Sequence, residues 1–453
     1  MTKNKFKKKN NKNLIYKILV NKIKKKLKNY NLKNFKPNHD IPTYFASYYH
    51  GYGLNFIKKT LGVKNDFFIF LFYIVKDLAY SSNYNDIKLL NNNKKNLFDK
   101  IIFTWGHKKN FEKNGSLQDN YFNINSRSTR NTHWVVLFVD KKLPIKIDKN
   151  ISLIHIVNRK KINFFLVLKI LISNFKYLIL DYQYYLFAIS SHNFLSQKIE
   201  HLFEKLIKKK TKSVLFTYEA QPFQNKIIQL LKNKNIKTLG YIHSPPLALP
   251  TNFIKKKDSP SKIFVNGRDQ KKCFMKLGWN KNEIKIVPSY RFLDIKKNFS
   301  NQIFFPISIK SIKEILRNLE FLKTNLKLNL NNFKIRNHPA SNNSQIHKKL
   351  ALKINNLKNN SYGTSLDNSN FKNYSIFIGA SGSIIEALER GIKVIQITEQ
   401  PILDFYSNYF WKSIKAKRIS NNIFIYTLLK KKNLIELGKK PKNLNVFFKN
   451  SDI

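Results

Sequence analysis

Residues 374–397 read YSIFIGASGSIIEALERGIKVIQI, the pattern of a strand, a tight turn, a helix and a second strand. Residues 375–378 and 394–397 are short apolar runs, and residues 384–390 have helical spacing. Gly391 follows the helical run and suits a helix C-cap. This βαβ unit predicts an α/β fold, and the rest of the chain is organised around it.

Small residues fill the turn between the first strand and the helix of this unit. Such residues let a phosphate approach backbone N–H groups at the positive end of a helix. We therefore expect Ser381, Gly382 and Ser383 to contact the phosphates of a ligand. Glu386 either satisfies the dipole of the helix or accepts hydrogen bonds from ribose hydroxyls. Turns of this composition also occur in α/β proteins without a ligand there, so both interpretations stay open.

A histidine stands at the end of another expected strand. Residues 333–336 form an apolar and basic run that leads into Asn337, His338 and Pro339. In an open α/β sheet, ligands bind at the carboxyl ends of the strands. Together with Arg336, His338 is a candidate contact to a donor phosphate.

With His338-Pro339 and residues 379–386, the second half of the chain resembles bacterial surface-polysaccharide glycosyltransferases of the B-type fold, and more distantly bacterial sialyltransferases. The segments YEAQPF (218–223), GYIHS (240–244) and FVNG (264–267) resemble, in that order, predicted surface carbohydrate biosynthesis proteins. The resemblance implies two facing Rossmann-like domains with a cleft between them. It also implies a nucleotide-sugar donor, held by the His-Pro pair and the serine motif, and a glycan or lipid-linked acceptor.

The base that deprotonates the acceptor hydroxyl is expected on the first half of the chain. Glu219, Asp119 and His243 all lie in expected loops, and Glu219 and His243 each follow a strand. Glu219 is our first candidate, with a packing role beside Gln221 as the alternative. In sialyltransferases the base belongs to an acidic pair followed by glycine. In this chain Gly115 follows a lysine and an asparagine, so that motif is not carried over.

The expected domains are a basic leader (1–36), an N-terminal acceptor domain (37–250) and a C-terminal donor domain (251–453). The boundary rests on residues 244–261, where prolines and lysines are concentrated as in a linker. Residues 405–432 are expected to be helical, and the terminal helices to cross back to the first domain.

The leader has the pattern of a basic amphipathic helix. Its apolar residues fall on one face and its lysines largely elsewhere; the apolar set is Leu14, Ile15, Ile18, Leu19, Ile23 and Leu27. It indicates either peripheral contact with anionic lipid, or a surface helix in a chain biased toward lysine.

The chain carries 84 Lys+Arg against 26 Asp+Glu, for a formal charge of +58. Such a charge is typical of nucleic-acid-binding proteins, but lysine, asparagine, isoleucine and phenylalanine are enriched together, as in A/T-rich coding sequences. No basic and aromatic motif for stacking bases accompanies the charge. We therefore expect no nucleic-acid partner.

A single cysteine, Cys273, excludes an internal disulfide and multi-cysteine metal sites. The longest apolar runs are far shorter than the ~20 residues of a spanning helix. We expect a cytoplasmic protein, with a peripheral position on the inner face of the cell membrane as the alternative. The sequence has no Walker motif, no Gly-x-Gly-x-x-Gly and no Asp-x-Asp. Transfer is therefore expected without a metal ion or a cofactor.

The leading hypothesis is a metal-independent glycosyltransferase that extends a surface polysaccharide or lipid-linked glycan. Two other enzymes of the same fold are alternatives: a nucleotide-sugar 2-epimerase and a glycerophosphotransferase. A basic nucleic-acid-binding protein is the remaining class.

Overall fold

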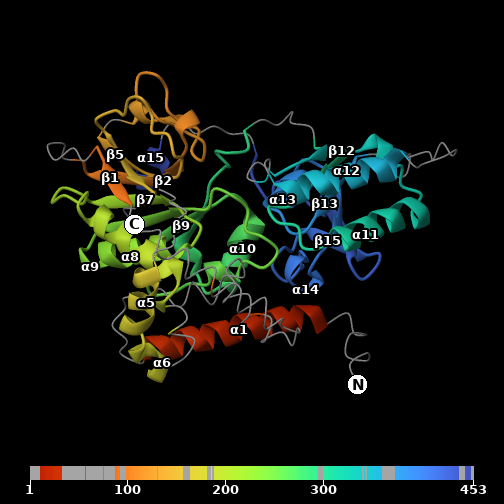
Figure 1. Ribbon diagram of the computed structural model, residues 1–453, viewed down its shortest axis with the longest axis horizontal. Coiled ribbons are helices and arrows are strands. Elements are labelled where there is room, and N and C mark those ends of the chain that lie inside the picture. Colours follow the sequence, from red (N-terminus) through yellow and green to blue (C-terminus); the bar gives the residue numbers. More distant parts are fainter. Residues whose placement is uncertain are drawn as a thin grey trace.

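A computed structural model (Figure 1) describes residues 11–32, 87–91, 98–129, 131–156, 164–180, 188–293, 299–338, 344–359, 373–437 and 444–449, with the single residues 57, 75, 185 and 341. It has two main β-sheets with helices packed around them, which confirms the α/β class.

The first sheet has 8 strands in the order β1-β6-β5-β2-β7-β8-β9-β10. Their bounds are β1 Lys88–Leu90, β2 Lys100–Gly106, β5 Thr132–Phe138, β6 Ile151–His155, β7 Ser213–Thr217, β8 Lys237–Tyr241, β9 Lys262–Val265 and β10 Ile284–Ile286. β1 pairs antiparallel with β6, and all other pairs are parallel. The central strands β5 and β7 are buried along their whole length, as their nearly continuous apolar sequences predict. The strand order reverses direction between β2 and β7, which is the switch point of this sheet.

The second sheet has 6 strands in the order β12-β11-β13-β14-β16-β15. Their bounds are β11 Gln302–Phe304, β12 Lys334–Arg336, β13 Tyr374–Ile378, β14 Lys393–Ile397, β15 Ile414–Arg418 and β16 Ile423–Leu428. β12, β11, β13 and β14 are parallel, and the switch point lies between β11 and β13. A small antiparallel pair joins β3 (Gln118–Asp119) to β4 (Ile124–Asn125).

Helices cover these sheets, and the first and second sheets lie at opposite sides of the view in Figure 1. The helices are α1 Asn11–Leu32, α5 Phe164–Ser173, α6 Lys176–Leu180, α8 Ser191–Glu204, α9 Pro222–Asn233, α10 Arg268–Lys276, α11 Ile312–Asn325, α12 Gln345–Asn359, α13 Gly382–Glu389, α14 Pro401–Asp404 and α15 Asn445–Lys449. The βαβ unit expected within residues 374–397 is confirmed as β13, α13 and β14. Gly391 has φ +84°, which suits its place after the helix.

The expected boundary at residue 250 is wrong. β8 and β9, which flank the proline-rich segment, pair with each other in the first sheet, with Leu239 opposite Lys262 and Tyr241 opposite Phe264. The prolines therefore mark a loop between neighbouring strands. The chain passes from the first sheet to the second after Ile286 and before Gln302.

The leader is a helix, α1, but the division of residues 1–36 from the rest is wrong. Tyr16, Leu19, Val20 and Ile23 are buried in the largest core cluster. The Tyr16 hydroxyl donates to the carbonyl of Ile402 at 2.7 Å. The buried face of α1 is not the one expected from the sequence. Leu14 and Ile18, which were expected on it, are exposed. An amphipathic pattern does not show whether protein or lipid covers the face.

Residues 405–432 are not mainly helical, because they contain the antiparallel strands β15 and β16. The expected return of the chain to the first half is confirmed. Phe447 of α15 packs its ring 4.8 Å from that of Phe264 and 5.3 Å from that of Tyr241.

Residues 432–436 fasten this returning chain to both halves of the molecule. The backbone N–H of Asp269 donates to the carbonyl of Asn433 at 2.9 Å, and that of Ser289 donates to the carbonyl of Glu436 at 2.9 Å. On the other side, the Glu389 carboxylate of α13 accepts from the N–H of Leu434 at 3.0 Å. Gly267 is required here, since a Cβ at this position would overlap the carbonyl oxygens of Asn433 and Leu434.

Candidate functional site

Two candidate residues of the first half meet at the switch point of the first sheet. Glu219 follows β7 and His243 follows β8, so both lie at the carboxyl edge of parallel strands, as expected. Glu219 Oε1 lies 3.2 Å from His243 Nε2. The His243 side chain is 3% exposed and that of Glu219 is 37% exposed. Glu219 is therefore the solvent-accessible member of the pair, and the buried His243 holds its carboxylate in place.

The loop that carries Glu219 is held by the buried side chain of Gln224. Its Oε1 accepts from the backbone N–H of Glu219 at 2.9 Å, and its Nε2 donates to the carbonyl of Thr217 at 2.7 Å. Asn252 donates to the carbonyl of Glu219 at 3.1 Å. Ala220 has φ +57°, an uncommon value for a residue with a side chain. The backbone of Glu219 is thus fixed on both sides.

Electrostatics keep the Glu219 carboxylate ionised. Burial raises its pKa, but the hydrogen bond and charge of His243, with smaller contributions from Gln221 and Arg291, bring the pKa below its ordinary value. A carboxylate with a lowered pKa carries its charge throughout the neutral range.

Asp119 is not placed to act as a base, because its side chain is buried and fully engaged. It accepts from the Thr104 hydroxyl at 2.7 Å and from the backbone N–H groups of Tyr121 and Phe122 at 2.8 and 2.7 Å. Burial raises the pKa of Asp119, and these hydrogen bonds offset part of the effect. Its turn sets the Tyr121 ring edge-on to the His243 ring, with 4.4 Å between centroids. Asp119 therefore holds the turn that carries Tyr121, and its own carboxylate is buried away from solvent.

At the second switch point, the loops after β11, β13 and β14 converge on Gly379. This glycine has φ +68°, and a Cβ added there would lie 3.5 Å from Pro306 and 4.0 Å from Glu399 Oε2. Glu399 Oε1 accepts from the N–H groups of Lys310 and Ser311 at 2.6 and 3.1 Å. Sequence reasoning missed Glu399, although its place directly after the 394–397 strand is the same signal that singled out His338.

The serine turn caps α13. Ser381 Oγ accepts from the N–H of Ser383 at 3.2 Å, and the Ser381 carbonyl accepts from the Tyr406 hydroxyl at 2.6 Å. A Cβ added to Gly382 would lie 3.2 Å from the carbonyl oxygen of Pro245. The small residue at 382 thus permits a close approach of the loop after β8, and the contact joins the carboxyl edges of the two sheets.

Glu386 lies beyond the first turn of α13 and is paired within its own helix. Its Oε1 accepts from Arg390 Nη2 at 2.8 Å and Nε at 3.1 Å, and both side chains are buried. Of its two expected roles, the one at the dipole of the helix is wrong, because Glu386 lies beyond the first turn of α13, and the contact with ribose hydroxyls stays a prediction.

Arg336 lies beside aromatic rings of the second half. Its guanidinium is 5.2 Å from the Phe304 ring and 5.4 Å from the Phe299 ring, and its Nη1 donates to Gln302 at 3.3 Å. These contacts hold the Arg336 side chain at the edge of the sheet, and its contact with a donor phosphate stays a prediction.

His338 follows β12 at the carboxyl edge, as expected, and is half-buried. Burial lowers the pKa of its imidazole, and the charges of Arg291 and His347 lower it further. His338 is therefore neutral near pH 7. Pro339, its expected partner, lies outside the described residues.

Arg291, which follows β10, connects the two halves of the site. It donates a hydrogen bond to the Ser244 hydroxyl. Its charge lowers the pKa of Glu219 beside the first sheet and that of His338 beside the second, and it offsets part of the rise that burial causes in the pKa of Tyr121, between β3 and β4. Sequence reasoning missed this residue, since nothing local distinguishes an arginine that follows a short strand.

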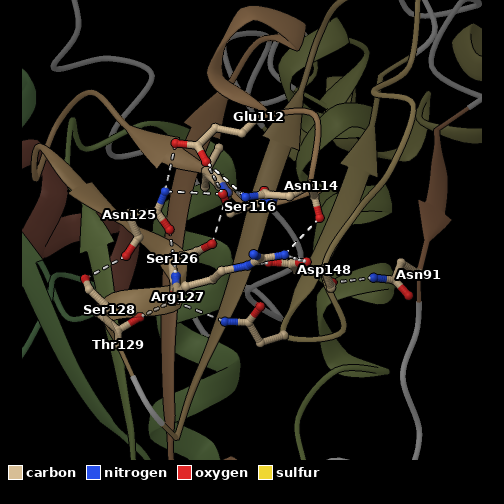
Figure 2. A network of polar contacts seen from close by, with 12 residues as sticks. Asn91, Glu112, Asn114, Ser116, Asn125, Ser126, Arg127, Ser128, Thr129 and Asp148 are labelled. Atoms are coloured by element: carbon tan, nitrogen blue, oxygen red, sulfur yellow. Dashed lines mark hydrogen bonds and ion pairs between the residues drawn. The ribbon is translucent and has the colours of Figure 1, made fainter.

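A separate polar network anchors the long connection between β2 and β5 (Figure 2). The Arg127 guanidinium binds both carboxylate oxygens of Asp148, at 2.7 and 2.9 Å, and donates to the Asn114 carbonyl at 2.9 Å. Asp148 and Arg127 precede β6 and β5, so this network lies at the amino ends of those strands. It holds the fold and is not part of the candidate site.

In the described part of the chain, no group of three or more His, Cys, Asp or Glu side chains is placed to hold a metal ion. No family model matches the sequence, and no curated protein matches it either.

Proposed function

We propose that the protein is a glycosyltransferase of the B-type fold, which transfers a sugar from a nucleotide-activated donor to a growing surface polysaccharide or lipid-linked glycan. The observation that carries the proposal is the meeting of two switch points. Arg291 acts on Glu219 and on His338, and the Pro245 carbonyl approaches Gly382. An acceptor group and a phosphate group need such opposed sets of residues.

In the proposed reaction, Glu219 takes the proton of the acceptor hydroxyl as its oxygen bonds to the anomeric carbon of the sugar. A carboxylate with a lowered pKa is a weak base, so proton transfer proceeds late, when the attacking oxygen has become acidic. The bond from the sugar to the nucleotide phosphate breaks in the same step. Arg291 and the neutral imidazole of His338 supply positive charge and an N–H donor to the departing phosphate. The reaction needs no metal ion.

The donor is identified first by thermal-shift screening with CMP-, UDP-, GDP- and CDP-linked sugars. A ligand present at about 100 times its Kd stabilises the native state by about 2.7 kcal/mol. At roughly 2–4 °C per kcal/mol, Tm should rise by about 5–10 °C for one nucleotide and little for the others. Transfer of radiolabel from that donor to an acceptor glycan then distinguishes a transferase from an epimerase, which releases free isomerised sugar.

Three variants test the site. Glu219→Gln should lower turnover by about 10²–10⁴-fold with donor binding retained. His338→Ala should lower turnover by about 10²-fold. Gly382→Val should weaken donor binding, because the branched side chain meets the Pro245 carbonyl.

The matched controls are Glu320→Gln and His201→Ala, which change exposed side chains on α11 and α8. They should leave binding and turnover unchanged. The proposal fails if no nucleotide sugar raises Tm, or if Glu219→Gln and His338→Ala keep full activity.

A further inference from the structure

An exposed apolar surface runs along α5 and α6, away from the candidate site. The side chains of Phe164, Phe165 and Ile172 are 74%, 85% and 67% exposed. Leu168, Phe175 and Leu178 continue the exposed row. Apart from Lys169 and Ser173, the sequence of α5, FFLVLKILIS, is apolar, and helices of this kind are normally covered by protein or lipid. We propose that this α5–α6 surface docks the protein on an anionic lipid bilayer.

The shape of the surface favours lipid over a protein partner. Large side chains project from a short helix, and among the described side chains of α5 the buried one, Ile170, lies on the opposite side. Phenylalanine and leucine side chains that project in this way enter the boundary between headgroups and acyl chains without needing a complementary pocket. α5 is about 15 Å long, half the hydrocarbon thickness of a bilayer, so it lies on the membrane surface. Among the described helices, none is long and apolar enough to cross a bilayer.

Charge complementarity favours anionic headgroups. Lys169 and Lys176 are exposed within the α5–α6 surface, and no acidic residue lies between Asp148 and Asp181. A second copy of the chain is a poor occupant, because two molecules with a formal charge of +58 would meet through surfaces of the same sign.

α1 adds charge on the same side of the molecule. In Figure 1, α1, α5 and α6 lie along one margin of the structure. The apolar face of α1 is buried against the protein, so its exposed lysines Lys17, Lys22 and Lys25 point away from the body. α1 contains no acidic residue. The apolar contact is thus assigned to α5 and α6, and α1 supplies long-range attraction. This inference does not depend on the proposed enzyme activity.

The test is flotation of the full-length protein with phosphatidylcholine vesicles that contain or lack phosphatidylglycerol. We expect binding to the anionic vesicles. A Phe164→Ser/Phe165→Ser/Ile172→Ser variant should bind about 100-fold more weakly, as partial burial of three large side chains is lost. Lys169→Gln/Lys176→Gln should bind anionic vesicles roughly 30-fold more weakly, at about 5-fold per lysine.

The matched control removes the same kind of side chain elsewhere. Ile145, Leu352 and Leu429 are also exposed, and their triple serine variant should bind like the wild type. Loss of binding in both triple variants, or in neither, overturns the proposal. So does absence of wild-type binding. Self-association of the wild type that the α5–α6 variant abolishes would assign the surface to a second copy and also overturn it.

A spectroscopic measurement covers the case in which a triple variant fails to fold. Cys273 is the only cysteine and is buried, so a cysteine introduced as Phe165→Cys can be labelled selectively with a polarity-sensitive fluorophore. Anionic vesicles should shift its emission to the blue, whereas the same label at Ile145→Cys should show no shift. Equal behaviour of the two labels contradicts docking through α5.

Discussion

Gly267→Ala should destabilise the protein through the contact that ties the returning chain to α10. Gly267 has φ −165°, so alanine fits its backbone, and the cost comes from the overlap of the new Cβ with the carbonyl oxygens of Asn433 and Leu434. Relief of the overlap moves residues 433–434 away. Two hydrogen bonds are then lost, from the Asp269 N–H to Asn433 at 2.9 Å and from Gln270 to Leu434 at 3.1 Å.

Overpacking costs about 1–3 kcal/mol, and each lost hydrogen bond costs about 1 kcal/mol. The free energy of unfolding should therefore fall by roughly 3–5 kcal/mol, measured by urea denaturation at pH 7.

Gly391→Ala is the control. Gly391 has φ +84° and nothing lies within 4 Å of an added Cβ. Alanine there bears only the left-handed backbone cost of about 1–2 kcal/mol. If Gly267→Ala is no more destabilising than Gly391→Ala, the close approach of the 432–436 segment is not a tight constraint.

Three further predictions concern stability. Burial lowers the pKa of His133 from 6.5 to about 4, so the unfolded chain takes up this proton first as pH falls. Stability should drop by up to about 3 kcal/mol between pH 6.5 and 4, and urea titrations of His133→Gln should lack this part of the decrease. Leu19→Ala should lower the free energy of unfolding by about 2–5 kcal/mol, and Leu14→Ala, which changes an exposed side chain, by under about 0.5 kcal/mol. Equal losses for the two variants in urea denaturation would contradict the burial of α1. Arg390→Ala should lower the free energy of unfolding by about 3–5 kcal/mol, because the Glu386 carboxylate is left buried and unpaired. A melting temperature equal to that of the wild type would refute the pairing.

Local pattern predicted the βαβ unit of this chain, but it was wrong for residues 405–432, where the strands β15 and β16 lie in place of the expected helices. The βαβ unit of residues 374–397 formed as expected, because apolar period, small turn residues and a C-cap glycine all indicate the same elements. Glu219 and His243 were placed on one edge by counting strand ends, and their 3.2 Å contact confirms it. The pairing of Glu386 with Arg390 follows from their spacing of four residues on a helix, and that signal was available in the sequence.

The sequence did not predict which strands share a sheet or which distant segments of the chain pack together. Prolines after β8 indicate a loop, but they do not say whether the next strand joins the same sheet. The apolar face of α1 gives no sign of what covers it. Arg291 belongs to the candidate site because its charge acts on Glu219 of the first half and on His338 of the second, and no local pattern records which residues of separate sheets lie near each other.

The return of the chain to the first sheet has a consequence for its synthesis on the ribosome. Phe122, Tyr241 and Tyr290 pack around Phe447, so their cluster stays incomplete until Phe447 has emerged from the ribosome. At roughly 5–20 residues per second, translation from Tyr290 to Phe447 takes about 8–30 s. During that interval the nascent chain presents an aromatic face that Phe447 does not yet cover. Emergence of Phe447, and not completion of β10, is then the event that allows this aromatic cluster of the first half to form.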